Sequence, residues 1–173
     1  MSRSRRCALK LGAVALAVLA GVGCTSDPEP ERGTVSSENA YIAIVEWEID
    51  QTEPVVDDDG EVELPVIYLA AASGETIEVG VQANVVSTVD DTAVIRFADQ
   101  AADALDAGTA GEPVKDDGVL MVIEEFEVGA PTADARVSLY RSTDDDRTWI
   151  LELTATETGV DVTDAAEAVD ATT

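Results

Sequence analysis

The first 24 residues constrain this chain most, because they decide which part of it remains to fold. An apolar run over positions 11–22, made only of Leu, Ala, Val and Gly, follows four basic residues: Arg3, Arg5, Arg6 and Lys10. A basic start, a short apolar stretch and an abrupt return to polar residues are the three parts of a secretory signal peptide. A spanning helix needs roughly 20 apolar residues, so the run is too short for an anchor. A buried core helix is the alternative, but it would begin with three arginines and run into a Pro- and Glu-rich segment.

The leader ends with Ala-Gly-Val-Gly-Cys at positions 20–24, and this segment resembles the lipobox of bacterial lipoproteins. At a lipobox the signal is cut and the cysteine is acylated. A lipobox usually has Leu three positions before the cysteine, where this chain has Gly21. The resemblance implies that residues 1–23 are removed and that Cys24 carries fatty acyl chains, of which two or more hold a protein stably at a membrane. The alternative is ordinary cleavage, which would leave Cys24 as a free thiol.

The rest of the chain is similar in composition, rich in Ala, Val and Asp, to membrane lipoproteins of high-GC Gram-positive bacteria. This resemblance implies an extracytoplasmic domain that is anchored to the cell membrane through Cys24. Residues 24–37 are polar, contain proline and lack apolar periodicity, which predicts a flexible tether. Residues 38–164 are predicted to form a single globular domain, and residues 165–173 a frayed acidic tail.

The composition argues against anionic partners, disulfide bonds and histidine-based sites. Removing the four leader cations leaves six basic against 36 acidic residues, so the formal charge is −30, compared with −26 for the whole chain. Charge of this sign repels nucleic acid and anionic lipid head groups, so neither is expected as a partner. With Cys7 removed and Cys24 acylated no disulfide can form, and the domain must be held by its apolar core. The chain has no histidine, which excludes His-based triads and His metal ligands.

The first segment of the predicted domain, residues 38–51, fits two kinds of secondary structure. Its apolar residues follow the helical spacing i, i+3, i+4, i+8 from Tyr41, with Ser37 as the N-cap. Alternate residues from Tyr41 to Ile49 are also apolar, as in a strand. We favour the helix, because the opposite face of a strand would mix isoleucine with glutamate. Residues 76–89 fit both periods equally and are left open.

The segments that follow are easier to assign. Four strands with short turns between them are predicted near the C-terminus, and short connections favour an antiparallel meander. The sequence therefore predicts an α+β fold, in which a single twisted antiparallel sheet ends in a C-terminal meander and helices cover one face. If residues 38–51 and 76–89 were strands, the domain would be an all-β sandwich. The predicted strands are 64–71, 93–98 (Phe97 inward), 119–128, 135–141, 148–156 and 160–163, with a short helix at 99–105 and loops at 52–62 and 106–118.

Two acidic runs could collect divalent cations. Clustered carboxylates suit calcium, and the run Asp57–Glu61 has four acids around Gly60. Aligned as an EF-hand loop, however, this run would place Val55 and Val66 at ligand positions. A solvated loop is the simpler interpretation, and low-affinity calcium binding is a weaker alternative. The run of three aspartates at 144–146 is interpreted as a hairpin turn.

No catalytic motif is present. The nucleophile elbow Gly-x-Ser-x-Gly, a P-loop and a Rossmann glycine fingerprint are all missing from the sequence, so no catalytic or cofactor-binding residue is assigned and an enzyme is not expected. The scarce cations Arg96, Arg141 and Arg147 could orient an anionic ligand. Pairing with neighbouring acids is the simpler expectation.

Two functions remain as hypotheses. The first is a non-catalytic binding or interaction module at the cell envelope, which predicts an exposed apolar groove or patch on the domain. The second is a small-ligand pocket protein or enzyme, suggested by an analogy between the segment from Tyr140 to Trp149 and the NTF2-like fold. That fold is a cone-shaped sheet and would need polar groups pointing into a closed interior.

Overall fold

The computed structural model describes residues 33–56, 60, 62–72, 74, 76–124 and 126–168. The leader, Cys24 and most of the predicted tether lie outside the described residues, as do Asp57–Asp59 and Glu61 of the predicted calcium loop. The described residues belong to a single compact unit.

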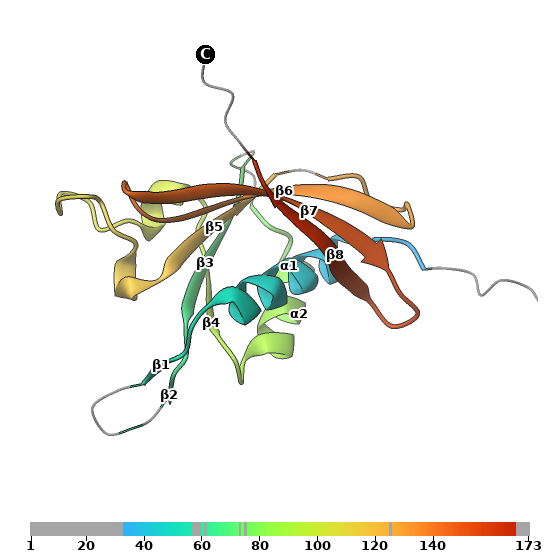
Figure 1. Cartoon of the computed structure of the whole chain (residues 1–173), viewed down its shortest axis with the longest axis horizontal. Helices are drawn as coiled ribbons and strands as arrows, with labels where there is room; N and C mark the ends of the chain where they lie inside the picture. Colours follow the sequence, from blue (N-terminus) through green and yellow to red (C-terminus); the bar gives the residue numbers. More distant parts are fainter. Residues whose placement is uncertain are drawn as a thin grey trace, which may run out of the picture. The chain divides into compact units, whose positions relative to one another are not determined.

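A mixed sheet of six strands, in the order β4-β3-β5-β6-β7-β8, forms the body of the domain (Figure 1). The strands β5 to β8 pair antiparallel in chain order, which confirms the predicted meander. The expectation of a wholly antiparallel sheet is wrong, because β3 lies between β4 and β5 and is parallel to both. Long connections allow such crossovers, and α2 lies in the first of them. The bounds are β3 Val66–Ala71, β4 Val94–Phe97, β5 Val119–Ile123, β6 Thr132–Ser142, β7 Asp145–Ala155 and β8 Val160–Glu167.

Two helices, α1 (Ser37–Gln51) and α2 (Val79–Val89), pack against one face of the sheet (Figure 1). Both segments that the all-β sandwich requires as strands are therefore helical, so the α+β prediction is confirmed and the sandwich is wrong. In α2 the i, i+4 spacing of its buried valines decides between the two periods. The N-cap of α1 is Ser36 rather than Ser37, because its Oγ accepts a hydrogen bond from the backbone N–H of Asn39 at 3.3 Å.

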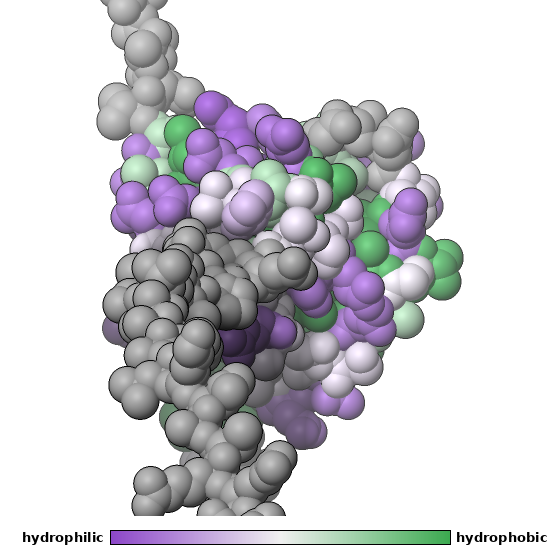
Figure 2. Space-filling model, turned by 90° about the vertical axis from the view of Figure 1, so that its right-hand side faces the viewer, coloured by the Kyte–Doolittle hydropathy of each residue, from purple (hydrophilic) through white to green (hydrophobic). Residues whose placement is uncertain are grey.

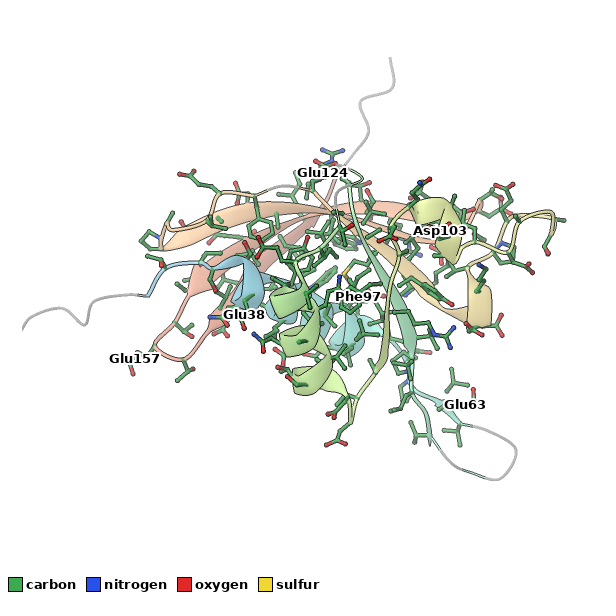
Figure 3. All side chains as sticks on the ribbon, turned by 180° about the vertical axis from the view of Figure 1, so that it is seen from behind. Glu38, Glu63, Phe97, Asp103, Glu124 and Glu157 are labelled. Atoms are coloured by element: carbon green, nitrogen blue, oxygen red, sulfur yellow. The ribbon has the colours of Figure 1, made fainter. Side chains whose placement is uncertain are left out.

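Strand β3 is buried on both faces, because short 3₁₀ helices cover the side opposite α1 and α2. Ile67 and Leu69 point into the main core with the two α-helices, whereas Tyr68 and Ala70 belong to a smaller cluster. That cluster includes residues from or next to η1 (Ala101–Ala104) and η2 (Lys115–Asp117). The short helix expected at 99–105 is thus present as η1. Phe97 is directed into the interior as predicted (Figure 3).

The domain is longer at both ends than residues 38–164. Val35 is buried; its N–H donates to Ala130 at 2.7 Å and its carbonyl accepts from Gly129 at 2.8 Å. At the other end β8 continues to Glu167, paired with β7. The predicted tether therefore extends too far into the domain, and the predicted tail begins too early. In both places backbone hydrogen bonds to the sheet, which residue composition does not reveal, fix the chain.

A separate two-stranded ribbon projects from this body (Figure 1). Its strands, β1 (Val55–Val56) and β2 (Val62–Glu63), pair antiparallel with each other. This segment was expected to be a loop. We call residues 55–56 and 62–64 the arm.

Candidate binding surface

The arm exposes a cluster of large apolar side chains. The exposed fractions are 59 % for Val55, 57 % for Val56, 61 % for Val62 and 40 % for Leu64. Scattered apolar residues are normal on a surface, but several together mark sites of interaction. The opposite side of the domain, seen in Figure 2, carries hydrophilic residues interspersed with small apolar areas. Four of the exposed large apolar side chains of the described residues thus lie together on the arm.

A groove of about 820 Å³ lies between the arm and the body of the domain. The last turn of α1, the start of β3 and the η2 turn form its other walls, with Thr92 beside them. Prolines flank the arm at its two junctions with the body and stiffen them, since proline fixes its own φ. The apolar lining consists of Ile49, Pro54, Val55, Val62, Leu64, Pro65 and Val66.

The charged groups that line the groove are all acidic. They are Glu53, Glu63, Asp116 and Asp117, and no Lys or Arg is among the lining residues. Asp116 forms an ion pair with Arg96 and also accepts a hydrogen bond from the Tyr68 hydroxyl at 2.7 Å. The hydrogen bond from Tyr68, together with the charge of Arg96, holds the pKa of Asp116 below its usual value. This wall of the groove is thus ionised and fixed in position.

The η2 turn holds its acidic residues in a strained backbone conformation. Asp116 and Asp117 have φ angles of 55° and 50°, a left-handed region that costs an L-residue about 1–2 kcal/mol. The following residue, Gly118, has no room for a side chain, because an added Cβ would lie 2.6 Å from the carbonyl oxygen of Val66. Close packing against β3 therefore keeps the turn in place. Strain of this kind is concentrated at ligand-binding and functional sites.

A buried ion pair holds the end of α1 against the sheet. Glu48 is 1 % exposed, and its Oε1 lies 2.7 Å from Nη2 of Arg141 on β6. Burial raises the pKa of Glu48, and the charge of Arg141 opposes that rise. Asp145 contacts both Arg141, at 3.8 Å, and Arg147, at 3.2 Å. With the pair formed by Arg96, the expectation that the three scarce arginines pair with acids is confirmed.

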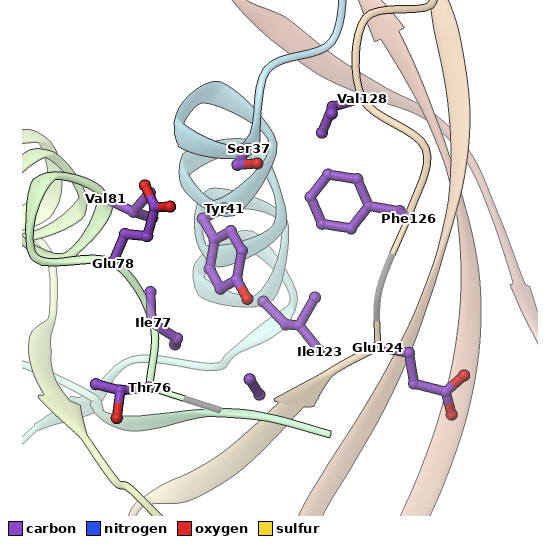
Figure 4. Close-up of a pocket in the computed structure, with 11 residues that line it drawn as sticks. Ser37, Tyr41, Thr76, Ile77, Glu78, Val81, Ile123, Glu124, Phe126 and Val128 are labelled. Atoms are coloured by element: carbon purple, nitrogen blue, oxygen red, sulfur yellow. The ribbon is translucent and has the colours of Figure 1, made fainter. Parts of the chain in front are cut away.

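A second, smaller pocket of about 260 Å³ lies where α1 meets the segment before α2 (Figure 4). The rings of Tyr41 and Phe126 face each other across it with centroids 6.2 Å apart. Burial raises the pKa of Tyr41. Glu124 points away from the pocket and pairs with Arg136 at 3.3 Å.

The residues singled out from the sequence are largely elsewhere. Cys24 lies outside the described residues, and the aspartate run at 144–146 lies at the β6–β7 hairpin, as predicted. Within the described ranges, no group of three or more His, Cys, Asp or Glu side chains is placed to hold a metal ion. In the same part of the chain no helix has the length and hydropathy needed to span a membrane. The hypothesis of a binding module predicts an exposed apolar groove or patch but not its place, although the valines on both sides of the acidic run were a signal for it.

Comparisons of the chain with protein-family models, with curated proteins and with solved structures found no match.

Proposed function

We propose that this protein is an extracytoplasmic lipoprotein, anchored to the cell membrane through an acylated Cys24, that binds another protein without catalysis. The binding surface is the arm together with the groove beside it. The observation that carries the proposal is the exposure of four large apolar side chains on one projecting ribbon. An envelope protein that is held by lipid and reaches outward with an apolar arm is suited to contact a partner.

The energy available at the arm supports this role. Full burial of a Val or Leu side chain is worth about 1.5–3 kcal/mol. More than half of the side-chain surface is still exposed at Val55, Val56 and Val62, and two fifths at Leu64. Covering all four side chains would therefore contribute roughly 4 kcal/mol of binding free energy. This is a substantial part of a micromolar interaction, which corresponds to about 8 kcal/mol. Exposing the same surface without a partner would only promote aggregation.

The groove, rather than the pocket beside Tyr41, is the better binding site. Ligand pockets typically measure about 300–1,000 Å³, and the groove, at about 820 Å³, falls in that range. The pocket measures about 260 Å³, below the range. Size therefore favours the groove over the pocket, and the apolar side chains that the arm exposes beside the groove favour a macromolecular partner.

The anchoring is tested by growing cells with a clickable fatty acid. We expect label on the wild-type polypeptide and none on Cys24→Ser, which should also leave the membrane fraction. Equal label on both proteins, or none on either, would refute acylation at Cys24.

The binding surface is tested by photocrosslinking in intact cells. A photoreactive amino acid at Val62 should give a discrete protein adduct. The matched control is Ile150, an apolar residue on β7 that is 41 % exposed and lies outside the groove. We expect no adduct there. The same adducts at both positions, or none at Val62, would overturn the proposed surface.

A further inference from the structure

We propose that the groove receives an extended polypeptide segment, alternately apolar and basic, that adds to the arm as a third strand. This inference rests on the proposed function and specifies the partner's chemistry.

Charge is the first argument. Glu53, Glu63 and Asp117 line the groove and take part in no ion pair among the described residues. Each arginine in that part of the chain pairs with another acid, and Lys115 donates to a backbone carbonyl, so none of these cations forms an ion pair with the three acids. The contacts are Arg96 with Asp116, Lys115 with the carbonyl of Asp103, Arg136 with Glu124, Arg141 with Glu48, and Arg147 with Asp145. Cations carried by a partner would complement these three carboxylates.

The shape of the arm is the second argument. Among the described strands, the two of the arm pair only with each other, and an isolated two-stranded ribbon is marginally stable in water. Three strands with an apolar face form a more stable unit, so an added strand would satisfy backbone groups at the arm's free edge. A peptide that binds in this way gains main-chain hydrogen bonds from the arm and side-chain contacts from the groove.

The register of the arm sets the pattern of the added strand. Val56 is paired with Val62, and Val55 with Glu63. Successive side chains of a strand point to opposite faces. One face of the ribbon is therefore apolar at this pair, and the other face carries a valine beside a carboxylate. A strand added beside the arm would place apolar residues on the face of Val56 and Val62, and Lys or Arg on the face of Glu63.

Charge also decides against the competing occupants. A second copy of the processed chain would bring another formal charge of −30 to an acidic groove. Nucleic acid and anionic lipid would add further negative charge. A cationic, partly apolar polypeptide is the occupant that both the lining and the arm favour.

The test uses the acylated protein in a non-ionic detergent and a peptide of about eight residues that alternates lysine and valine. We expect measurable binding by calorimetry that weakens as salt is added. Two control peptides replace lysine with glutamate, or valine with serine, and a third has N-methylated backbone amides on alternate residues. All three should bind at least about tenfold more weakly, since each lacks one of the three contributions.

Variants locate the binding on the protein. Glu63→Gln should weaken binding about threefold, the effect of a partly exposed ion pair, and Val62→Thr about tenfold. Glu157→Gln is the matched control, because it removes the same charge at the β7–β8 turn, away from the arm (Figure 3). Equal weakening by E63Q and E157Q would reduce the effect to nonspecific attraction and overturn the inference.

Other results would also overturn it. One is that the lysine–valine peptide does not bind at millimolar concentration. Another is that the protein forms concentration-dependent dimers and that V62T abolishes them. A third is that the unacylated Cys24→Ser protein still floats with anionic vesicles and that this flotation depends on Val62. If photocrosslinking at Val62 succeeds while the peptide fails, this inference is wrong and the proposed function stands. If photocrosslinking at Val62 gives nothing, the proposed function itself fails.

Discussion

Replacing Arg141 with methionine should cost the domain about 3–5 kcal/mol of unfolding free energy at neutral pH. Glu48 is 1 % exposed and lies 2.7 Å from Arg141. Methionine retains much of the apolar stem of arginine but carries no charge. The loss would therefore arise mainly from a carboxylate left in the interior without its cation. Adding Glu48→Gln to Arg141→Met should recover most of it, because a neutral amide is much less costly to bury.

The cost of Arg141→Met should depend on pH in a defined direction. Burial raises the folded-state pKa of Glu48, and Arg141 limits that rise. A raised pKa gives a contribution to stability that is fully present below the unfolded pKa and is lost as pH increases through the folded pKa. Without Arg141 the folded-state pKa of Glu48 should rise further, so the variant should lose more of its unfolding free energy at neutral pH. As pH falls toward the ordinary Glu range, Glu48 takes up its proton in both folded proteins, and the difference between them should shrink.

Urea denaturation of the wild type and Arg141→Met, each at about pH 4 and at neutral pH, measures this difference. Subtracting the two proteins at each pH cancels the titration of the other carboxylates. Arg147→Met is the matched control: its side chain is 55 % exposed, so its loss should be at most about 1 kcal/mol with little change with pH. A cost of Arg141→Met that is the same at both pH values, or no larger than that of the control, would refute the reasoning.

The remaining predictions concern the backbone, and urea denaturation measures each. Gly118→Ala should lower the free energy of unfolding by about 1–3 kcal/mol, because the added Cβ would meet the carbonyl of Val66. Gly159→Ala is the control, since Gly159 has open space around it. Equal effects of the two substitutions would contradict the clash at Gly118. Gly80→Ala in α2 also has open space and should gain about 0.5–1 kcal/mol from helix propensity; a loss would mean that the glycine is required there. Ser36→Ala should cost about 1 kcal/mol through the lost N-cap, whereas Ser36→Asp, an alternative N-cap, should cost much less.

The C-terminal meander could be predicted because its information is local. Leu151 and Leu153 are buried on β7 and flank Glu152, which is exposed, and short turns leave little choice but antiparallel neighbours. The helix α1 could be predicted for the same reason. The direction of β3 could not, because strand polarity depends on the path of the connections. Its continuous apolar run, Val66–Ala71, is nevertheless typical of a strand buried on both faces, which is common in parallel sheets.

The location of the groove escaped prediction because the groove is assembled from distant parts of the chain. The strands of the arm are two residues long, too short for a period-2 pattern to appear, and the Pro, Asp and Gly around them indicate a loop. The partner of Glu48 is 93 residues away in sequence. One signal was available: Glu48 follows Ile44 by four residues, which places an acid on the apolar face of the predicted helix and requires a cation opposite it.

The buried ion pair and the groove share one element, the last turn of α1. Thr52, which lines the groove, donates a hydrogen bond from its Oγ1 to the carbonyl of Glu48 at 2.9 Å. The arm leaves the body two residues later, at Pro54. Losing Arg141 would therefore loosen the base of the groove before the domain unfolds. We expect Arg141→Met to weaken binding of the lysine–valine peptide at neutral pH in the absence of urea, and Arg147→Met to leave it unchanged. Unaltered affinity in Arg141→Met would show that the arm is positioned by its prolines alone, independently of the ion pair.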